Sequence, residues 1–557
     1  MIGKRRHCKG SDHGRCFREY FIDCPSDILK SLLGQFEALT LLKDLSVQAA
    51  LARPPAQTLG QNLGELFESE SCCDIVLVYQ GHHIPAHKSV LMARCPFFSR
   101  HLAFHNPADR EFHLRISNSC LGISVLRLVL KYLYTGNSDL LANLDDAITM
   151  LEDEFGIPNS LESDVSFLLE TLSLGDLRLV FDSAEFLCHR TIVAARSPFF
   201  ARVIEKKRTD HDQLIMDIRL DSEIIPAKYA RVLIHAVYLD NLDFRLIDQQ
   251  FEGDPNDHVQ DAMNLYEIGR FLEFHFLSQS CEDLLMQLMT VDNVVSILNW
   301  SLHPHGSAWI SRQALQFLEE EFYNVVNNMD VLGSLSHATI VRLLQSDFTQ
   351  ASESEVLQAL IKWGEHQLNQ QQQQYSNASS STTNNPVLVA TATLGRANKN
   401  GSNGHHSTKR REICDSELKE LLSSLIGHVR VAHVLPRDRT SEALDMALQR
   451  NLFTVLPNFS SQINASTKYS PWDPKSNNGL FVRPRLFLPY FEECKKLIQD
   501  RCAQDPEIVA NNSPCVSVPD TLYMLRSRNK MDFYQQHHAT STEDLLEIPT
   551  SKVPGKA

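Results

Sequence analysis

The stretch DIVLVYQGHHIPAHKSVLMARCPFFSRHL at residues 74–102 returns without a gap as DLRLVFDSAEFLCHRTIVAARSPFFARVI at residues 176–204. Ten of the paired positions are identical, where residue frequencies of a few per cent each would give about two by chance. A second echo follows, with LRLVLKYLYTG at 126–136 against ARVLIHAVYLD at 230–240. A unit of about 100 residues is too long for a solenoid repeat, so the sequence predicts a duplicated domain.

In each copy, the spacing of apolar residues changes from a strand pattern to a helical pattern. The runs at 75–79 and 177–181 have strand propensity and are too short for a helix. Gly81 marks a turn, after which the chain can return as the second strand of a hairpin. From Lys88 and Arg190 the pattern is helical, and the following proline must end that helix or begin the next. Each copy is therefore predicted to be a small sheet with helices.

Both copies carry a recognisable order of residues, and the first carries it more fully. Asp-[Ile/Leu]-x-Leu-Val is followed by His, a basic residue, Ala-Arg and Pro-Phe-Phe, with Tyr-Leu-Tyr-Thr-Gly at 132–136. This order resembles the BTB/POZ domain, whose fold is a small sheet capped by helices. Behind the second copy, residues 261–368 are helical in pattern, and the segments at 359–363 and 429–431 resemble the BACK module that commonly follows BTB/POZ domains. The resemblance implies an α+β chain of two tandem BTB/POZ domains followed by an all-α BACK-like domain.

A change in amino-acid composition interrupts the helical pattern once, within the BACK-like region. Residues 370–374 are five glutamines, and 375–408 are rich in Ser, Thr, Asn and Gly, a composition that cannot build a core. We therefore expect a disordered insertion within the helical module. The predicted divisions are a disordered basic N-terminus (1–25), a helical segment (26–62), the first BTB/POZ domain (63–168), the second (169–288), a BACK-like domain (289–440) interrupted by low-complexity residues 369–412, and a C-terminal region (441–557) of which 479–525 is partly ordered.

The overall composition restricts the class of partner. The 557 residues carry 53 Lys and Arg against 68 Asp and Glu, a formal net charge of −15, so direct nucleic-acid binding is not expected. The 13 cysteines form no CxxC pair, which predicts reduced thiols in a reducing compartment. No apolar run approaches the length of a membrane span. We expect a protein of the nucleus, the cytoplasm or both, and the resemblance leads us to expect a long polar tail that this sequence does not contain.

No catalytic motif stands out in the sequence. There is no GxxxxGK[ST], GxSxG or HExxH pattern and no Cys/His array with zinc spacing, so we expect no catalytic residue, no cofactor and no metal. His82, His83 and His87 lie close together, but a hairpin turn separates the first two from the third. His87 recurs as His189 in the second copy, which favours a structural role over a metal ligand.

A matched acid–base pair recurs in both copies, as Asp74 with Lys88 and Asp176 with Arg190. The BTB/POZ resemblance implies that such residues line a charged pocket near a dimer interface. The alternative is a half-buried ion pair that holds the hairpin in place.

A short motif follows the Pro-Phe-Phe of the second copy. The resemblance implies that BTB/POZ domains that bind the third cullin often carry a hydrophobic-x-Glu motif that ends seven residues after the proline. Val203, Ile204 and Glu205 fit this pattern, whereas the first copy has His-Leu-Ala at 101–103 and no acid. An apolar side chain with one acceptor suits a shallow docking groove. The alternative is an ordinary exposed helix end.

Our first hypothesis is a non-enzymatic adaptor that mediates protein–protein interaction and dimerisation. BTB copies would associate with each other or with another chain, and the second copy would recruit a cullin three ubiquitin ligase. In this hypothesis Arg483, Arg485 and Phe487 in the tail bind a substrate.

The alternative hypothesis is a nuclear co-regulator or scaffold without ubiquitin ligase function. It is motivated by the missing acid in the first copy and by the basic run Lys409, Arg410 and Arg411, a candidate nuclear import element. The resemblance implies a developmental role in epithelial remodelling.

Overall fold

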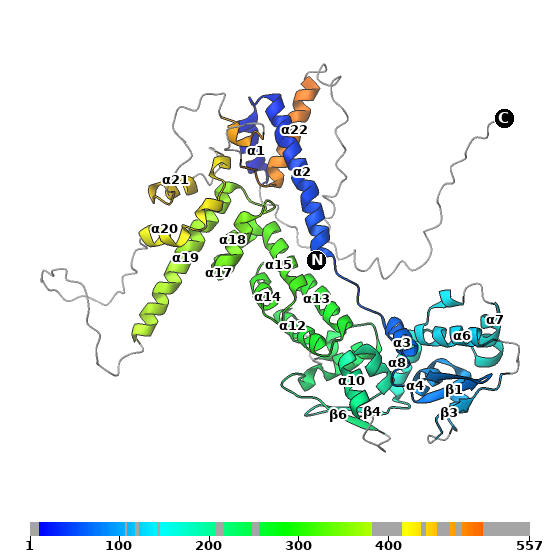
Figure 1. Ribbon diagram of the computed structural model, residues 1–557. Coiled ribbons are helices and arrows are strands. Elements are labelled where there is room, and N and C mark those ends of the chain that lie inside the picture. Colours follow the sequence, from blue (N-terminus) through cyan, green and yellow to red (C-terminus); the bar gives the residue numbers. More distant parts are fainter. Residues whose placement is uncertain are drawn as a thin grey trace, which may run out of the picture. The chain divides into compact units, whose positions relative to one another are not determined.

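The computed structural model describes residues 10–105, 109–116, 122–141, 145–207, 215–247, 255–380, 415–435, 442–453, 468–474 and 482–504. These residues are mostly helical, with two small three-stranded sheets (Figure 1). The α+β fold class that the sequence predicts, two sheet-containing copies followed by a helical region, is confirmed. The chain divides into two compact units. One comprises Ala50–Leu318, and the other comprises Met1–Ala49 with Glu319–Ala557.

The first copy is built around a central strand with alternating burial. Strand β1 (Ile75–Tyr79) pairs antiparallel with β2 (His82–Ala86) and parallel with β3 (Glu111–His113). Gln80 and Gly81 both have positive φ, 50° and 79°, as a two-residue hairpin turn requires. The predicted turn at Gly81 is therefore present. The copy continues with helices α4 (Lys88–Arg94), α5 (Pro96–Leu102) and α6 (Ile123–Thr135).

The second copy repeats this arrangement. Strand β4 (Leu177–Val180) pairs antiparallel with β5 (Glu185–Cys188) and parallel with β6 (Met216–Arg219). The strand orders β2-β1-β3 and β5-β4-β6 are equivalent, so the duplicated sequence is a duplicated structure. The matching helices are α9 (Arg190–Arg196), α10 (Pro198–Lys207) and α11 (Ala230–Tyr238).

One further helix precedes each copy, α3 (Leu59–Glu68) and α8 (Leu161–Thr171). We call these two the leading helices. The remaining elements between and behind the copies are η1 (Ser138–Leu140), α7 (Asp145–Thr149), η2 (Met150–Phe155), η3 (Ala227–Tyr229), η4 (Phe244–Leu246), α12 (Pro255–Phe271), α13 (His275–Leu288), α14 (Val294–Ser301) and α15 (Ala308–Glu320).

The other unit is helical throughout its described part. It is assembled from both ends of the chain, because its core cluster contains residues from the first 40 positions and from positions after 430. Its elements are α1 (Gly10–Phe21), α2 (Ser26–Leu51), α16 (Phe322–Asn327), α17 (Met329–Ser334), α18 (His337–Gln345), α19 (Glu353–Ser380), α20 (Asp415–Leu422), η5 (Ile426–His428), η6 (Val431–His433), α21 (Glu442–Gln449), η7 (Ser470–Trp472) and α22 (Leu488–Gln504).

The N-terminus differs from our expectation of a disordered segment over 1–25. Helix α1 begins at Gly10, and Phe17 and Phe21, one turn apart, are fully buried. Their rings contact Trp472, with centroids 6.1 and 5.2 Å away, and Arg18 pairs with Asp500 at 2.7 Å. The partners that order this helix lie more than 450 residues away, so local composition could not reveal them. Residues 1–9 lie outside the described part.

The low-complexity insertion begins later than the predicted residue 369. Helix α19 continues through the glutamine run and ends at Ser380. Glutamine is a good helix former, so a helix that has already begun can extend through it. The rest of the predicted insertion, residues 381–412, lies outside the described part, as does the C-terminal region after residue 504. Among the helices described, none combines the length and the apolar character that crossing a bilayer requires.

Candidate functional site

A buried histidine joins sheet to helix in the first copy. The Nε2 atom of His87 lies 2.8 Å from the carbonyl oxygen of Ser71, and Nδ1 lies 2.8 Å from Tyr134 Oη. Since Nε2 faces a carbonyl, it carries the hydrogen, and Nδ1 accepts from the tyrosine hydroxyl. The same hydroxyl accepts the His87 backbone N–H at 2.8 Å. Both ring nitrogens of His87, its backbone N–H and the Tyr134 hydroxyl are thereby hydrogen-bonded.

The second copy reproduces these contacts. His189 Nε2 lies 2.6 Å from the Ser173 carbonyl oxygen, and its Nδ1 and backbone nitrogen lie 2.7 and 2.8 Å from Tyr238 Oη. Burial lowers the pKa of both imidazoles, that of His87 to about 4. The structural role that the repeat favoured for this histidine agrees with the contacts. Among the described residues, no group of three or more His, Cys, Asp or Glu side chains could hold a metal ion.

Acidification should destabilise this junction. The His87 pKa falls from 6.5 when unfolded to about 4 when folded, so the unfolded state binds more protons between these values. The stability contribution is complete above pH 6.5 and lost as the pH falls, by about 2 kcal/mol at pH 5. Hydrogen exchange of α4 in the full chain at pH 7, 6 and 5 measures this loss. We expect a shallower pH slope in His87→Gln and an unchanged one in His82→Gln, on the exposed strand end. Equal slopes in all three proteins would contradict the assignment.

The two predicted acid–base pairs occupy the same junctions. Asp74 accepts the backbone N–H of Lys88 at 2.8 Å, and Asp176 accepts that of Arg190 at 2.8 Å. In the second copy the Arg190 Nε also donates to Asp176, at 2.8 Å. Each aspartate thus holds the first residue of a helix against the hairpin, which is a structural role. That these residues also line a charged pocket at a dimer interface stays a prediction.

A buried arginine in the first copy reaches the leading helix of the second. Arg94, at the end of α4, donates from Nε to the Leu133 carbonyl at 2.9 Å and from one terminal nitrogen to the Asn159 carbonyl at 2.6 Å. The same nitrogen pairs with the carboxylate of Asp164 in α8. Arg94 therefore binds its own copy and the helix that leads the other.

The matching arginine of the second copy reaches back to the leading helix of the first. Arg196 donates to the Asn62 side chain in α3 at 2.7 Å and to the Gln57 carbonyl at 3.3 Å. It also pairs with Asp240 of its own copy at 2.8 Å. Asp240 in turn accepts the Leu59 backbone N–H, at 2.8 Å, from the start of α3.

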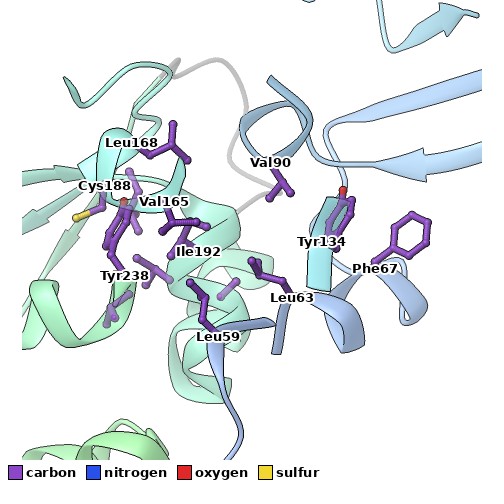
Figure 2. Packing of buried hydrophobic residues seen from close by; sticks show 14 of the residues in the cluster. Leu59, Leu63, Phe67, Val90, Tyr134, Val165, Leu168, Cys188, Ile192 and Tyr238 are labelled. Atoms are coloured by element: carbon purple, nitrogen blue, oxygen red, sulfur yellow. The ribbon is translucent and has the colours of Figure 1, made fainter. Parts of the chain in front are cut away.

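These contacts are approximately symmetric, because the leading helix of each copy packs against the other copy. Helix α3 packs against α6 of its own copy and α9 of the other, and α8 packs against α11 of its own copy and α4 of the other. The offset of 102 residues between the strands also relates Gln57 to Asn159 and Asn62 to Asp164. Figure 2 shows Leu63 of α3 between Ile192 of the second copy and Tyr134 of the first, within one continuous core. We call this arrangement the exchange interface.

The exchange interface was missed by our sequence analysis, although the signal was present. The repeat extends upstream of the quoted stretch, because TLGQNLGELFE at 58–68 aligns with SLESDVSFLLE at 160–170 at the same offset. Thr58 and Ser160 are matching N-caps, and each accepts a backbone N–H three residues later. Extending the repeat to these caps would have identified both leading helices.

The candidate cullin-contact residues lie in the second half of helix α10. Ile204 is only 2% exposed and belongs to the core, Val203 is partly buried against that core, and Glu205 is exposed. In the equivalent slot of the first copy, Leu102 is buried in the same way between exposed neighbours. The middle residue therefore anchors the helix, and its two neighbours are the ones that a partner can reach. The import candidates Lys409, Arg410 and Arg411 lie outside the described residues.

Two of the three tail residues that we expected to bind a substrate have another role. Arg485 and Phe487 are buried, and the Arg485 Nε pairs with Glu353 at 2.6 Å. Arg485 also donates to the carbonyl oxygens of Leu344 and Ser346, at 2.7 and 2.5 Å. Arg485 and Phe487 close the helical unit, so the expectation that these two bind a client was wrong. For Arg483, whose side chain is 49% exposed, substrate binding stays a prediction.

Comparison with known proteins supports the domain order read from the fold. The BTB/POZ domain model matches residues 63–172 and 167–288, and the model described as BTB And C-terminal Kelch, or BACK, matches residues 295–378. The chain is 34% identical to BTB/POZ domain-containing protein 7 of Homo sapiens over 95% of this chain and 48% of that protein. It is 24% identical to Kelch repeat and BTB domain-containing protein 3 of Mus musculus, over 35% of this chain and 29% of that protein. The chain spans about half the length of the human and mouse BTB/POZ domain-containing protein 7.

Proposed function

The chain carries two BTB/POZ domains followed by a BACK domain, and on this basis we propose that it is a non-enzymatic adaptor that docks other proteins. BTB/POZ domains generally mediate protein interaction and dimerisation. The observation that carries the proposal is the exchange interface, where two copies with one shared core form a double platform. Two copies that share one core present their surfaces together, and a preorganised surface lowers the entropy cost of docking.

We further propose that the second copy recruits the third cullin through α10. Support comes from Val203 and Glu205, the accessible neighbours of the buried Ile204 on α10. The partly buried valine offers apolar area, and the carboxylate offers one acceptor that orients the partner. The first copy has His101 and Ala103 at these positions, so it presents neither a matching apolar group nor an acid.

Capture of purified cullin three by the full chain tests this contact. A Val203→Ala, Glu205→Ala variant is expected to weaken binding by about ten-fold or more, since an apolar contact and a charge-oriented hydrogen bond are both removed. The matched control is His101→Ala in the equivalent slot of the first copy, which should bind as the wild type does. Unchanged capture by the double variant would eliminate this contact, and equal losses in variant and control would point to a general effect.

We also propose the nuclear scaffold as an alternative function. The supporting observation is the basic run Lys409, Arg410 and Arg411, which lies within a segment rich in Ser, Asn and Gly. Imaging the tagged full chain, with and without neutralisation of these three residues, tests it. Nuclear accumulation that is lost on neutralisation supports the alternative, and wholly cytoplasmic wild-type protein counts against it.

A further inference from the structure

The two halves of the exchange interface share one geometry but differ in charge. Arg94 obtains its only carboxylate among the described contacts from Asp164, which lies in the leading helix of the other copy. Arg196 meets an amide, Asn62, at the same position of the opposite leading helix. It obtains a carboxylate from Asp240 of its own copy instead.

The position that matches Asp240 in the first copy cannot supply an acid. Tyr134 and Tyr238 are equivalent, because each makes the same contact with the histidine of its own copy. Gly136 and Asp240, two residues after these tyrosines, are therefore equivalent as well. Gly136 ends α6 with a positive φ of 68° and has no side chain that could approach Arg94. The first copy therefore depends on the leading helix of the second for its countercharge.

We propose that these charges select the pairing of the first copy with the second and work against the pairing of like copies. In a pair of two first copies, Asn62 would face Arg94, and a buried guanidinium would be left without a carboxylate. In a pair of two second copies, Asp164 would join Asp240 at Arg196, so two acids would share one guanidinium. Only the mixed pair gives each buried arginine one carboxylate.

Each like pairing carries a penalty that the mixed pairing avoids, because a buried charge without its partner is strongly unfavourable. The connectivity of the chain also favours the mixed pairing. Because both copies belong to one chain, the second copy is also present at a high effective concentration around the first. The exchange interface is closed, since each leading helix already occupies the other copy. The partner that this surface fits is thus the other copy of the same chain, and a second chain is excluded from it.

Photo-leucine cross-linking of the full-length protein tests both parts of the proposal. Leu59 and Leu63 of α3 are buried in the shared core, so diazirine leucine at these positions should react with α9. Light and ¹⁵N-labelled chains are mixed, unfolded in urea, refolded together and irradiated. We expect α3–α9 cross-links within light chains and within heavy chains, with hybrid cross-links near the background of unmixed samples. Abundant hybrids in the wild type would overturn the closed pairing.

The charge selection is tested by removing the Arg94–Asp164 pair from the interface, while the Arg196–Asp240 pair remains. In the Arg94→Met, Asp164→Asn variant no buried guanidinium is stranded, so the fold should persist while the discrimination against first-copy pairs disappears. Cross-links from α3 of one chain to α4 of another, the signature of first-copy pairs, should then rise by about ten-fold or more. Glu162→Gln, an exposed change in the same helical turn as Asp164, should match the wild type. If the Arg94→Met, Asp164→Asn variant folds without this rise, the selection is refuted. Neither readout depends on a cullin.

Discussion

The Arg485→Met variant is expected to lose about 3–5 kcal/mol of folding free energy in the helical unit that contains α18 and α19. Arg485 is 3% exposed and pairs at 2.6 Å with Glu353, which is 4% exposed. Methionine fills a similar volume but leaves the Glu353 carboxylate with the Arg430 backbone N–H, 2.9 Å away, as its remaining described partner. The carbonyl oxygens of Leu344 and Ser346 lose a donor as well.

The measurement must separate this unit from the BTB/POZ pair, because a chain of two units need not unfold in one step. Native-state hydrogen exchange of the full chain, followed by mass spectrometry on peptides of α18 and α19, reports the local opening free energy. The control is Arg483→Met, two residues away, whose side chain is 49% exposed and lies 3.5 Å from Asp347. It should change stability by less than about 1 kcal/mol. Similar losses in the two variants would show that burial of the Arg485–Glu353 pair is not the cause.

The Phe17→Ala variant is expected to lose about 3–5 kcal/mol in the same unit, as large aromatic deletions in cores do. Phe17 is fully buried, stacks on Phe21 with a centroid separation of 4.3 Å and on Tyr490 at 5.2 Å, and meets the edge of Trp472. Its removal leaves a cavity between the first and last helices that the structure describes. We therefore expect α22 to exchange its amide hydrogens faster although the substitution lies in α1.

Exchange of α22 peptides in the full chain measures this coupling, and Ile22→Ala is the matched control. Ile22 lies five residues from Phe17 but is 58% exposed, so its truncation should have little effect. Protection of α22 that is unchanged in Phe17→Ala would mean that α1 does not support this helix. Loss of protection in both variants would point to fraying of α1 in general.

Several features of the copies could be predicted from residues close together in the chain. The strand at 75–79 has too few apolar residues for a helix, and Gly81 provides a turn that the hairpin needs. Both signals act within a few residues, which is the range over which a periodic pattern can be read. The candidate cullin-contact residues were located on a helix for the same reason, but their burial could not be judged. Ile204 faces the core because of how α10 packs, which the triplet does not encode.

The burial of several single side chains, by contrast, could not be predicted from nearby residues. Arg483 and Arg485 look alike in the sequence, but one lies at the surface and the other is enclosed by Glu353 and several carbonyl groups. Phe17 likewise lies in a stretch that reads as polar and basic, and its partners are supplied by the last helices described. In both instances the deciding contact joins residues more than 100 positions apart.

The residues of this chain, read in order, were sufficient to establish the duplication, the hairpin and helix pattern of each copy and the helical region that follows. Those features follow from local periodicity and from similarity at a constant offset. How each leading helix packs onto the other copy, which arginine obtains which carboxylate, and how the first helix meets the last became known from the folded chain alone. Burial depends on the three-dimensional path, and a distant partner leaves no period in the sequence that would reveal it.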